Sequence, residues 1–463
     1  MPKATTIDRY QFMHRLPRIL SESRALFALS LPIILSQVAY SLLGLIDTVM
    51  AGHAGAEEQA AVALGVAFWI PVFITLMSVV QAISPTVAQH FGAGDHAAVV
   101  QDTHEGIWLA GLSSLLPALL MPGVTPIMVW AEIDPVLIDK TLLFLWGIVV
   151  GFPAAMIFRA LAFYSASINR PKPMMFLAFA GLGVNALFNW LLIWGHWGLP
   201  AMGGAGCGWA TAIGMWVALI ALVGWTVWSP EYRTCYLWRG WHVPHWGIQK
   251  RLLRIGLPMG GAALAEVAAF TSIAVFVGRF GAAQIAAHQI ALNVASLLFM
   301  LPMGLAAAVT IRVGQKLGGG DAAAARFVAW TGVAMGLIIA CALIPLILLG
   351  RDLIVTIYSP DAAVRQIASG LVLLAAVWQL ADATQVIAIG ALRGYKVTFG
   401  PMLIMFVAFW VIGLPLGMQL GYHGIGRIPP MEVYGFWSGL VAALILAGLA
   451  LSAWLRVVAK ARL

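Results

Sequence analysis

The sequence predicts an all-α polytopic membrane protein, with twelve transmembrane helices in two pseudo-symmetric six-helix bundles. Of its 463 residues, 62% are hydrophobic and only 10% are charged, whereas soluble domains are roughly 45–50% apolar and about 25% charged. Apolar stretches of about 20 residues, enough to cross a hydrocarbon core of about 30 Å, recur with short polar breaks. A repeat between the two halves of the chain then indicates two related bundles.

The apolar stretches define the expected membrane spans. The basic N-terminus followed by an apolar run imitates a secretory signal, but the run exceeds the usual length of about 7–15 residues and is better interpreted as a retained first span. We expect spans near residues 25–50, 62–86, 104–122, 138–162, 174–195, 204–228, 253–277, 285–310, 325–349, 363–391, 400–420 and 434–456.

The distribution of basic residues predicts the orientation. If both termini are cytoplasmic, 21 of the 26 Lys and Arg residues, Lys3 among them, fall on the inner side, as expected for cytoplasmic loops. The formal charge of +8 is therefore explained by topology. Because the basic residues are scattered singly, no nucleic-acid partner is expected, and the partner surface is the lipid bilayer.

The repeat relates residues 29–95 to residues 255–321. At a constant shift of 226, without gaps, 17 of the 67 positions are identical, including Pro32/Pro258, Gly55/Gly281, Gly94/Gly320 and Asp95/Asp321. Six spans per half is an even number, so both halves enter the membrane in the same direction and are related by an axis along the membrane normal.

We expect an N-terminal lobe at 1–240 and a C-terminal lobe at 241–463, around a cavity that opens to each side in turn. The connection at 229–249 is rich in Trp and His. Its aromatic residues suit the membrane interface, and a ligand-binding role for His242 and His245 is the alternative.

Of the 18 carboxylates, 15 lie in termini, loops or span ends, and three lie further inside predicted spans: Asp47, Glu266 and Asp382. A charge at mid-membrane costs at least about 2.5–3.5 kcal/mol, so a cavity, a proton or a cation is expected to compensate. Acids that are hydrogen-bonded within the bundle to fix helix register are the structural alternative. At the shift of 226, Glu266 aligns with Tyr40, seven residues before Asp47, so the halves share a scaffold but not a site.

Two amides accompany the first acid. Asn185 and Asn189 are four residues apart, which puts both on one helical face. Their carbonyl oxygens can join Asp47 around a small hard cation such as Na⁺, and hydrogen bonding between helices alone is the alternative. Glu266 and Asp382 are further candidate ligands of Na⁺. The three cysteines have no metal or redox spacing, and no cofactor is expected.

Several stretches carry a family resemblance: "LPIILSQ" with "IDTVMAGHAG", "GLPMGGAALAE", "AAHQIALNVASLLFMLPMGLAAAVTIRVGQ" and "QLADATQVIAIGALRGYK". In these the chain resembles the multidrug and toxic compound extrusion family, in particular its NorM-like branch. The resemblance implies cation-driven efflux of bulky, mostly cationic and amphipathic compounds. It also implies a transporter rather than an enzyme, in the bacterial cytoplasmic (inner) membrane, and we expect a monomer.

The resemblance assigns roles to individual residues. Asp47 looks like the family's N-lobe acid, with Asn185 and Asn189 as its companions, and Glu266 and Asp382 look like the C-lobe pair that binds the coupling cation. Phe299 stands where some members carry a tyrosine facing that cation, and Asp361 resembles part of an acidic patch near the cavity mouth of some members. The candidate substrate-binding residues are Phe299, Asp361, Gln289 and Asp47.

The function predicted is exchange of organic cations for Na⁺ and/or H⁺ by alternating access, and there are three alternatives. A lipid-linked saccharide flippase is expected to line its cavity with Arg and Lys, whereas the acids here are the buried charges. An aspartyl protease using Asp47 and Asp382 needs two carboxyls at close range, and no Gly-x-Gly-Asp pattern surrounds either. Sugar-porter-like facilitators carry a basic loop where this chain has "AQHFGAGDHAAVVQ".

Overall fold

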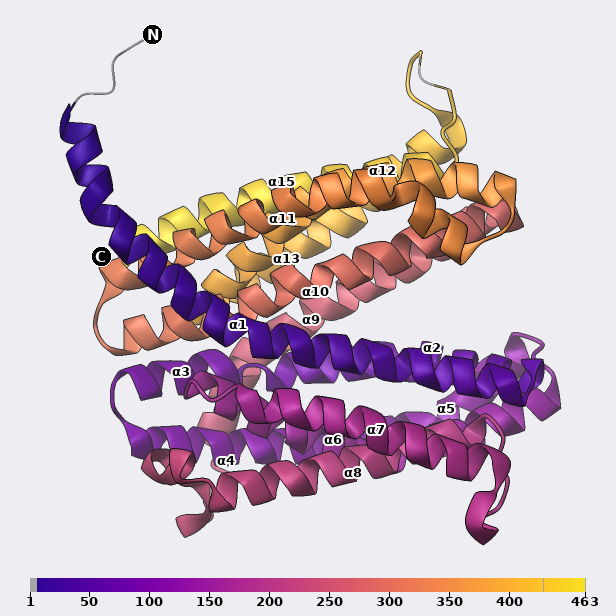
Figure 1. Cartoon of the computed structure of the whole chain (residues 1–463), viewed down its shortest axis with the longest axis horizontal. Coiled ribbons are helices and arrows are strands. Elements are labelled where there is room, and N and C mark those ends of the chain that lie inside the picture. The colour runs from indigo at the N-terminus through magenta and orange to yellow at the C-terminus, as the bar shows by residue number, and fades with distance from the viewer. Residues whose placement is uncertain (1–5, 428, 463) are drawn as a thin grey trace. The chain divides into compact units, whose positions relative to one another are not determined.

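The computed structural model describes residues 6–427 and 429–462, with side chains described from Pro17 onward within these ranges. Lys3, which is predicted to be cytoplasmic, therefore lies outside the described residues. Within them the chain is helical and has no β-strand (Figure 1). This confirms the predicted all-α class.

The first half of the chain contains eight longer helices. Their bounds are α1 (Thr6–Ala54), α2 (Ala56–Val80), α3 (Ile83–Gly92), α4 (His96–Ser113), α5 (Leu116–Trp130), α6 (Pro135–Ser167), α7 (Lys172–Trp194) and α8 (Ala205–Trp228). The connection to the next helix, which we call the linker (residues 229–245), contains two short 3₁₀ helices, Pro230–Cys235 and Leu237–Arg239.

The second half continues with α9 (Trp246–Val277), α10 (Ala282–Gly318), α11 (Ala322–Tyr358), α12 (Ala362–Gly394), α13 (Phe399–Phe406), α14 (Leu414–Met418) and α15 (Val433–Ala461). The π-helical turns Val407–Gly413 and Gln419–His423 flank α14. The four short pieces from Phe399 to His423 thus form one continuous span.

Twelve helical segments of the described chain are long and apolar enough to cross a membrane, as predicted. Most extend beyond the predicted spans, because their polar ends continue the helix outside the apolar stretch. The predicted span 138–162, for example, is Pro135–Ser167 in the structure. Arg159, three residues before the end of the predicted span, consequently lies about two turns before the end of α6.

The repeat is visible in the backbone. Gly55 and Gly281, which precede α2 and α10, have φ angles of 147° and 100°, and Gly94 and Gly320 have φ angles of 74° and 77°. These conformations are available to glycine at little steric cost. The aligned acids cap equivalent helices: Asp95 accepts from Ala98 N at 3.0 Å before α4, and Asp321 accepts from Ala324 N at 2.8 Å before α11.

The chain forms two compact units. The central unit is Leu35–Ala268, and the terminal unit combines the described residues up to Ile34 with those from Ala269 onward. Both boundaries fall inside helices, α1 and α9, so the first part of each belongs to a different unit from its second part. The predicted lobes 1–240 and 241–463 remain a prediction drawn from the repeat.

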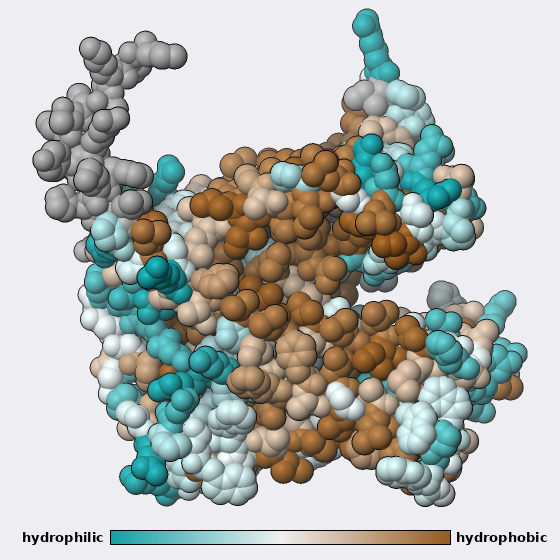
Figure 2. Space-filling model, viewed as in Figure 1, coloured by the Kyte–Doolittle hydropathy of each residue, from teal (hydrophilic) through white to brown (hydrophobic). Residues whose placement is uncertain are grey.

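Each unit is built around one strongly buried helix. In the central unit α6 packs against α2, α4 and α8, and in the terminal unit α12 packs against α10, α11 and α15 (Figure 1). Within each unit, apolar residues cover the middle of the helices and hydrophilic residues gather at their ends (Figure 2). This is the distribution that a hydrocarbon layer between two aqueous surfaces requires.

Candidate functional site

Asp47 lies in a closed ring of hydrogen bonds inside the central unit. Asn189 Nδ2 donates to Asp47 Oδ1 at 2.6 Å, and Thr211 Oγ1 donates to Asp47 Oδ2 at 3.2 Å. Asn189 Nδ2 also donates to Asn185 Oδ1 at 3.0 Å, and Asn185 Nδ2 donates to Thr211 Oγ1 at 3.1 Å. The structure thus brings Asp47, Asn185 and Asn189 together, from α1 and α7, as the sequence predicted.

The ring is buried and rich in oxygen. Asp47 is 8% exposed, both amides are fully buried and Thr211 is 4% exposed. Asn189 Oδ1 is buried and makes no hydrogen bond within the described part of the chain. A buried acceptor without a donor is costly, and carboxylate and amide oxygens are the ligands that a small hard cation prefers. These oxygen atoms are therefore suitable ligands for a cation next to Asp47.

Close packing of α8 brings a residue that sequence reasoning missed, Thr211, to the acid. A Cβ added at Gly208 would lie 2.2 Å from Phe144 O of α6, and one at Gly206 would lie 2.9 Å from Leu192 C of α7. Cys207, one turn before Thr211, has its Sγ 3.6 Å from Asp47 O. The sequence carried one signal for this residue: Cys207 and Thr211 are four residues apart in a stretch rich in Gly and Ala.

Arg159 of α6 contacts the same helix as the acid. Its guanidinium carbon lies 4.2 Å from the centre of the Tyr40 ring, and its Nη1 donates to Gln37 Oε1 at 3.4 Å. Tyr40 precedes Asp47 by seven residues, which is about 10 Å along α1. This half-buried cation is held against an aromatic face, an arrangement that stabilises it by about 0.5–2 kcal/mol.

The two other predicted acids lie in different units. Glu266 is half-buried on α9 in the central unit, and Asp382 is 3% exposed on α12 in the terminal unit. Both make interactions with other parts of the chain. Their pairing around one cation remains a prediction.

The candidate substrate residues of the terminal unit are dispersed. Phe299 is half-buried and Gln289 is exposed, both on α10. Asp361 is exposed and caps α12, because its Oδ1 accepts from the backbone of Ala363 at 2.7 Å and of Val364 at 3.3 Å. Helix capping accounts for an acid at this position without a ligand.

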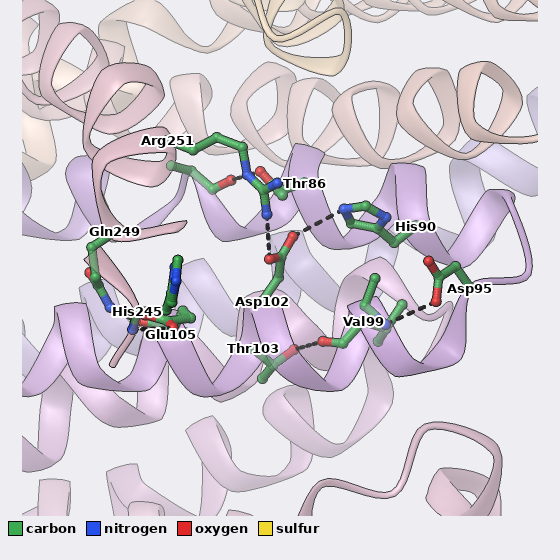
Figure 3. A network of polar contacts seen from close by, with 12 residues as sticks. Thr86, His90, Asp95, Val99, Asp102, Thr103, Glu105, His245, Gln249 and Arg251 are labelled. Carbon is green, nitrogen blue, oxygen red and sulfur yellow. Dashed lines mark hydrogen bonds and ion pairs between the residues drawn. The ribbon is translucent and has the colours of Figure 1, made fainter. Parts of the chain in front are cut away.

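The linker histidines are engaged with α4, and Figure 3 shows His245 beside Glu105 of that helix. His245 N donates to Glu105 Oε1 at 2.6 Å. His104 Nε2 lies 2.9 Å from the Leu237 carbonyl oxygen. Because a carbonyl oxygen can only accept, His104 Nε2 carries the proton. His104 Nδ1 therefore accepts a hydrogen bond from His242 Nδ1, at 2.9 Å. Both histidines that were considered as ligands therefore serve to dock the linker.

Two acids of α4 complete this network (Figure 3). Asp102 and Glu105 are each 1% exposed. Arg251 Nη2 donates to Asp102 Oδ1 at 2.6 Å, and His90 Nε2 lies 3.1 Å from Asp102 Oδ2. Gln249 Nε2 donates to Glu105 Oε2 at 2.6 Å. The sequence placed these acids at a span end, yet they are buried and paired.

A depression of about 560 Å³ in the terminal unit contains none of the predicted site residues. It is lined by Gly370, Leu373, Leu374, Pro430, Met431, Glu432, Tyr434 and Ser438. No group of three or more His, Cys, Asp or Glu residues suited to a metal occurs in the described chain.

The MatE family model matches this sequence twice, over residues 32–191 and 258–418. The chain belongs to the MatE family. The two matches begin 226 residues apart, which is the shift of the internal repeat. Membership confirms the family resemblance drawn from the sequence motifs.

Relatives of this MatE protein are similar over nearly its whole length. The probable multidrug resistance protein NorM of Chromobacterium violaceum is 42% identical over 446 residues, 96% of either chain. The multidrug resistance protein PmpM of Pseudomonas aeruginosa is 40% identical over 446 residues, covering 96% of this chain and 93% of that one. The crystal structure of the eukaryotic MATE transporter AtDTX14 superposes with a TM-score of 0.85 at 17% identity, covering 96% and 98% of the two chains, and so supports the fold.

Proposed function

We propose that this chain is a secondary active multidrug exporter, which moves organic cations and amphipathic drugs out of the cell in exchange for Na⁺ and/or H⁺. The observation that carries the proposal is the buried ring of Asp47, Asn185, Asn189 and Thr211. An acid placed deep in a membrane helix is expected to bind cations or protons. The names of the relatives, multidrug resistance proteins, support drugs as the substrates.

The ring is proposed to couple ion and drug movement. A Na⁺ ion or a proton from outside occupies Asp47 and stabilises one arrangement of the two lobes. Its release inside leaves a negative site that favours a lipophilic cation. Coupling requires that each ligand binds the two arrangements with different affinity, because equal binding to both shifts no equilibrium.

A second ion site is proposed for the C-terminal half. Glu266 and Asp382 are its carboxylates, and Phe299 supplies an aromatic face for the cation. Gln289 and Asp361 are proposed as outer contacts of the drug. This part of the proposal rests on the family resemblance and on the placement of both acids within membrane-spanning helices.

The cellular setting follows from the same proposal. We propose a monomer with lobes at 1–240 and 241–463 in the bacterial inner membrane, with both termini cytoplasmic. The coupling ion is a transported substrate, so no cofactor is required.

Proteoliposomes test the proposal. Vesicles loaded with a fluorescent organic cation are given a Na⁺ gradient or a pH gradient separately, with wild type and the variants Asp47→Asn, Glu266→Gln and Asp382→Asn. We expect gradient-driven efflux in wild type and a loss of at least tenfold in each variant. Thr48→Val is the matched control, because Thr48 adjoins Asp47 but, among the described residues, its hydroxyl bonds only Gly44 O, at 2.9 Å. Normal efflux by all three acid variants under both gradients would refute the assignment.

A further inference from the structure

The first four turns of α9 present two different faces. One face, with Gln249, Leu252, Ile255 and Met259, is buried, and its apolar members pack with Val79, Ala82 and Leu109 of the central unit. The opposite face exposes Trp246, Lys250, Arg254 and Leu257. Steps of four, four and three residues keep these four side chains on one side of a helix.

This exposed face is held in place. Gln249 and Arg251, which lie beside it on α9, bond the buried acids Glu105 and Asp102 of α4. A Cβ added at Gly256 would lie 2.4 Å from Val79 O of α2, so the backbones of α9 and α2 are in close contact. The beginning of α9 is therefore a fixed part of the central unit.

The exposed face carries uncompensated positive charge. Lys250 and Arg254 make no ion pair in the described chain, and Asp102, the acid that contacts this part of α9, already pairs with Arg251 at 2.6 Å. The linker adds two more exposed cations, Arg233 and Arg239. A surface of this kind attracts anions.

We propose that the face formed by Trp246, Lys250, Arg254 and Leu257 binds the head group of an anionic phospholipid. The four residues follow one another from the polar end of the helix into the span, and about 6 Å of helix axis separates the two cations. A phosphodiester between them places glycerol and acyl chains against Leu257. Trp246, 73% exposed, is a residue typical of the membrane interface.

The order of these residues favours a lipid over free phosphate. Leu257 is 58% exposed, and a soluble anion gives neither it nor Trp246 an apolar partner. The face includes none of the residues assigned to ion or drug binding, so the inference stands or falls independently of the proposed function.

Lipid titration tests the inference. The purified full-length protein in a neutral detergent is titrated with phosphatidylglycerol or phosphatidylcholine, and bound lipid is counted by native mass spectrometry. We expect preferential retention of phosphatidylglycerol, weakened about 25-fold in Lys250→Gln/Arg254→Gln, because each basic residue at a membrane surface contributes about 1 kcal/mol, or roughly fivefold. Both side chains are exposed, and unchanged thermal unfolding verifies the fold of the variant.

A matched variant separates a site from net charge. Lys460→Gln/Arg462→Gln removes two exposed cations at the end of α15, and it is expected to retain wild-type affinity. The inference would be overturned if this control lost as much affinity for phosphatidylglycerol as Lys250→Gln/Arg254→Gln. It would also be overturned if wild type retained the two lipids equally, or if equimolar inorganic phosphate displaced phosphatidylglycerol.

Discussion

Asn189 and Asp47 are 142 residues apart in sequence and are joined by a hydrogen bond of 2.6 Å from the amide Nδ2 to the carboxylate Oδ1. The same amide nitrogen donates to Asn185 Oδ1, while its own oxygen is buried without a donor in the described residues. One side chain thus both stabilises the acid and offers an oxygen beside it. This double role makes Asn189 the most informative position to change.

Asn189→Ala is expected to weaken the binding of the coupling ion. The substitution removes the buried amide oxygen that has no donor in the described residues, and losing this oxygen ligand should raise the half-saturating Na⁺ concentration about tenfold or more. Drug efflux from proteoliposomes, measured over a series of Na⁺ concentrations and pH values, provides this quantity. An ion dependence identical to that of wild type would show that the amide is only structural.

Thr211 is expected to contribute through its hydroxyl. Thr211→Val keeps the shape but loses the donor to Asp47 Oδ2 and the acceptor for Asn185 Nδ2. We expect a three- to tenfold lower half-saturating ion concentration, because the lost hydrogen bond, worth about 1 kcal/mol, stabilises the empty carboxylate and not the ion-bound one. Thr211→Ser, which restores the hydroxyl, is expected to return close to the wild-type value. Equal behaviour of the two variants would contradict the role of the hydroxyl.

The parts of the site that depend on helix periodicity were predictable from the sequence. Asn185 and Asn189 share a face because four residues make about one turn, and Gly55 and Gly281, which the repeat aligns, both have positive φ angles. Thr211 was not predictable in this way. Its place beside Asp47 depends on how closely α8 approaches its neighbours, and that distance is a property of packing.

The sequence pattern also did not predict that the acids on α4 are buried. Asp102 and Glu105 precede or begin the apolar stretch 104–122 and were expected at a span end. In the structure α4 begins earlier, at His96, because Asp95 caps it, and the returning linker and α9 cover both acids. Contacts between segments about 140 residues apart leave no local signature.

Gly208 is expected to be intolerant of a side chain. A Cβ would lie 2.2 Å from Phe144 O, so Gly208→Ala must push α8 away from α6 and should destabilise the fold by about 1–3 kcal/mol. Thermal unfolding of the purified protein measures the change. Gly181→Ala on α7, where nothing lies within 4 Å, is the control and should be neutral. If both variants unfold alike, the close approach of α8 and α6 is wrong.

Asp102→Asn is expected to loosen the attachment of α9 to α4. The buried carboxylate pairs with Arg251, whose side chain is 46% exposed. Because solvent screens the Arg251 side of the pair, the loss should be smaller than for a fully buried pair, about 1–3 kcal/mol. Glu57→Gln is the control, since the Glu57 side chain is 76% exposed. Thermal unfolding again provides the comparison, and equal midpoints for both variants would contradict the network.

Cys235 is expected to resist alkylation while the linker is docked. Burial raises the pKa of its thiol to about 11, against about 8.5 for a free thiol. Tyr164 Oη donates to the Cys235 carbonyl at 2.6 Å and His96 Nδ1 lies 3.2 Å from its Sγ. At pH 8 only about one thiol in a thousand is then ionised, so alkylation should be at least a hundredfold slower than for a free thiol and should accelerate as the pH approaches 11.

Iodoacetamide labelling of the double variant Cys207→Ala/Cys341→Ala measures this rate, because only Cys235 of the three cysteines remains. The comparison is a thiol at the neighbouring exposed position, Thr234→Cys with all three native cysteines changed to alanine. Fast labelling of Cys235 at pH 8, equal to that of the exposed thiol, would mean that the linker leaves α4 and α6 on the labelling timescale. Slow labelling that becomes fast only in denaturant is the result that a docked linker requires.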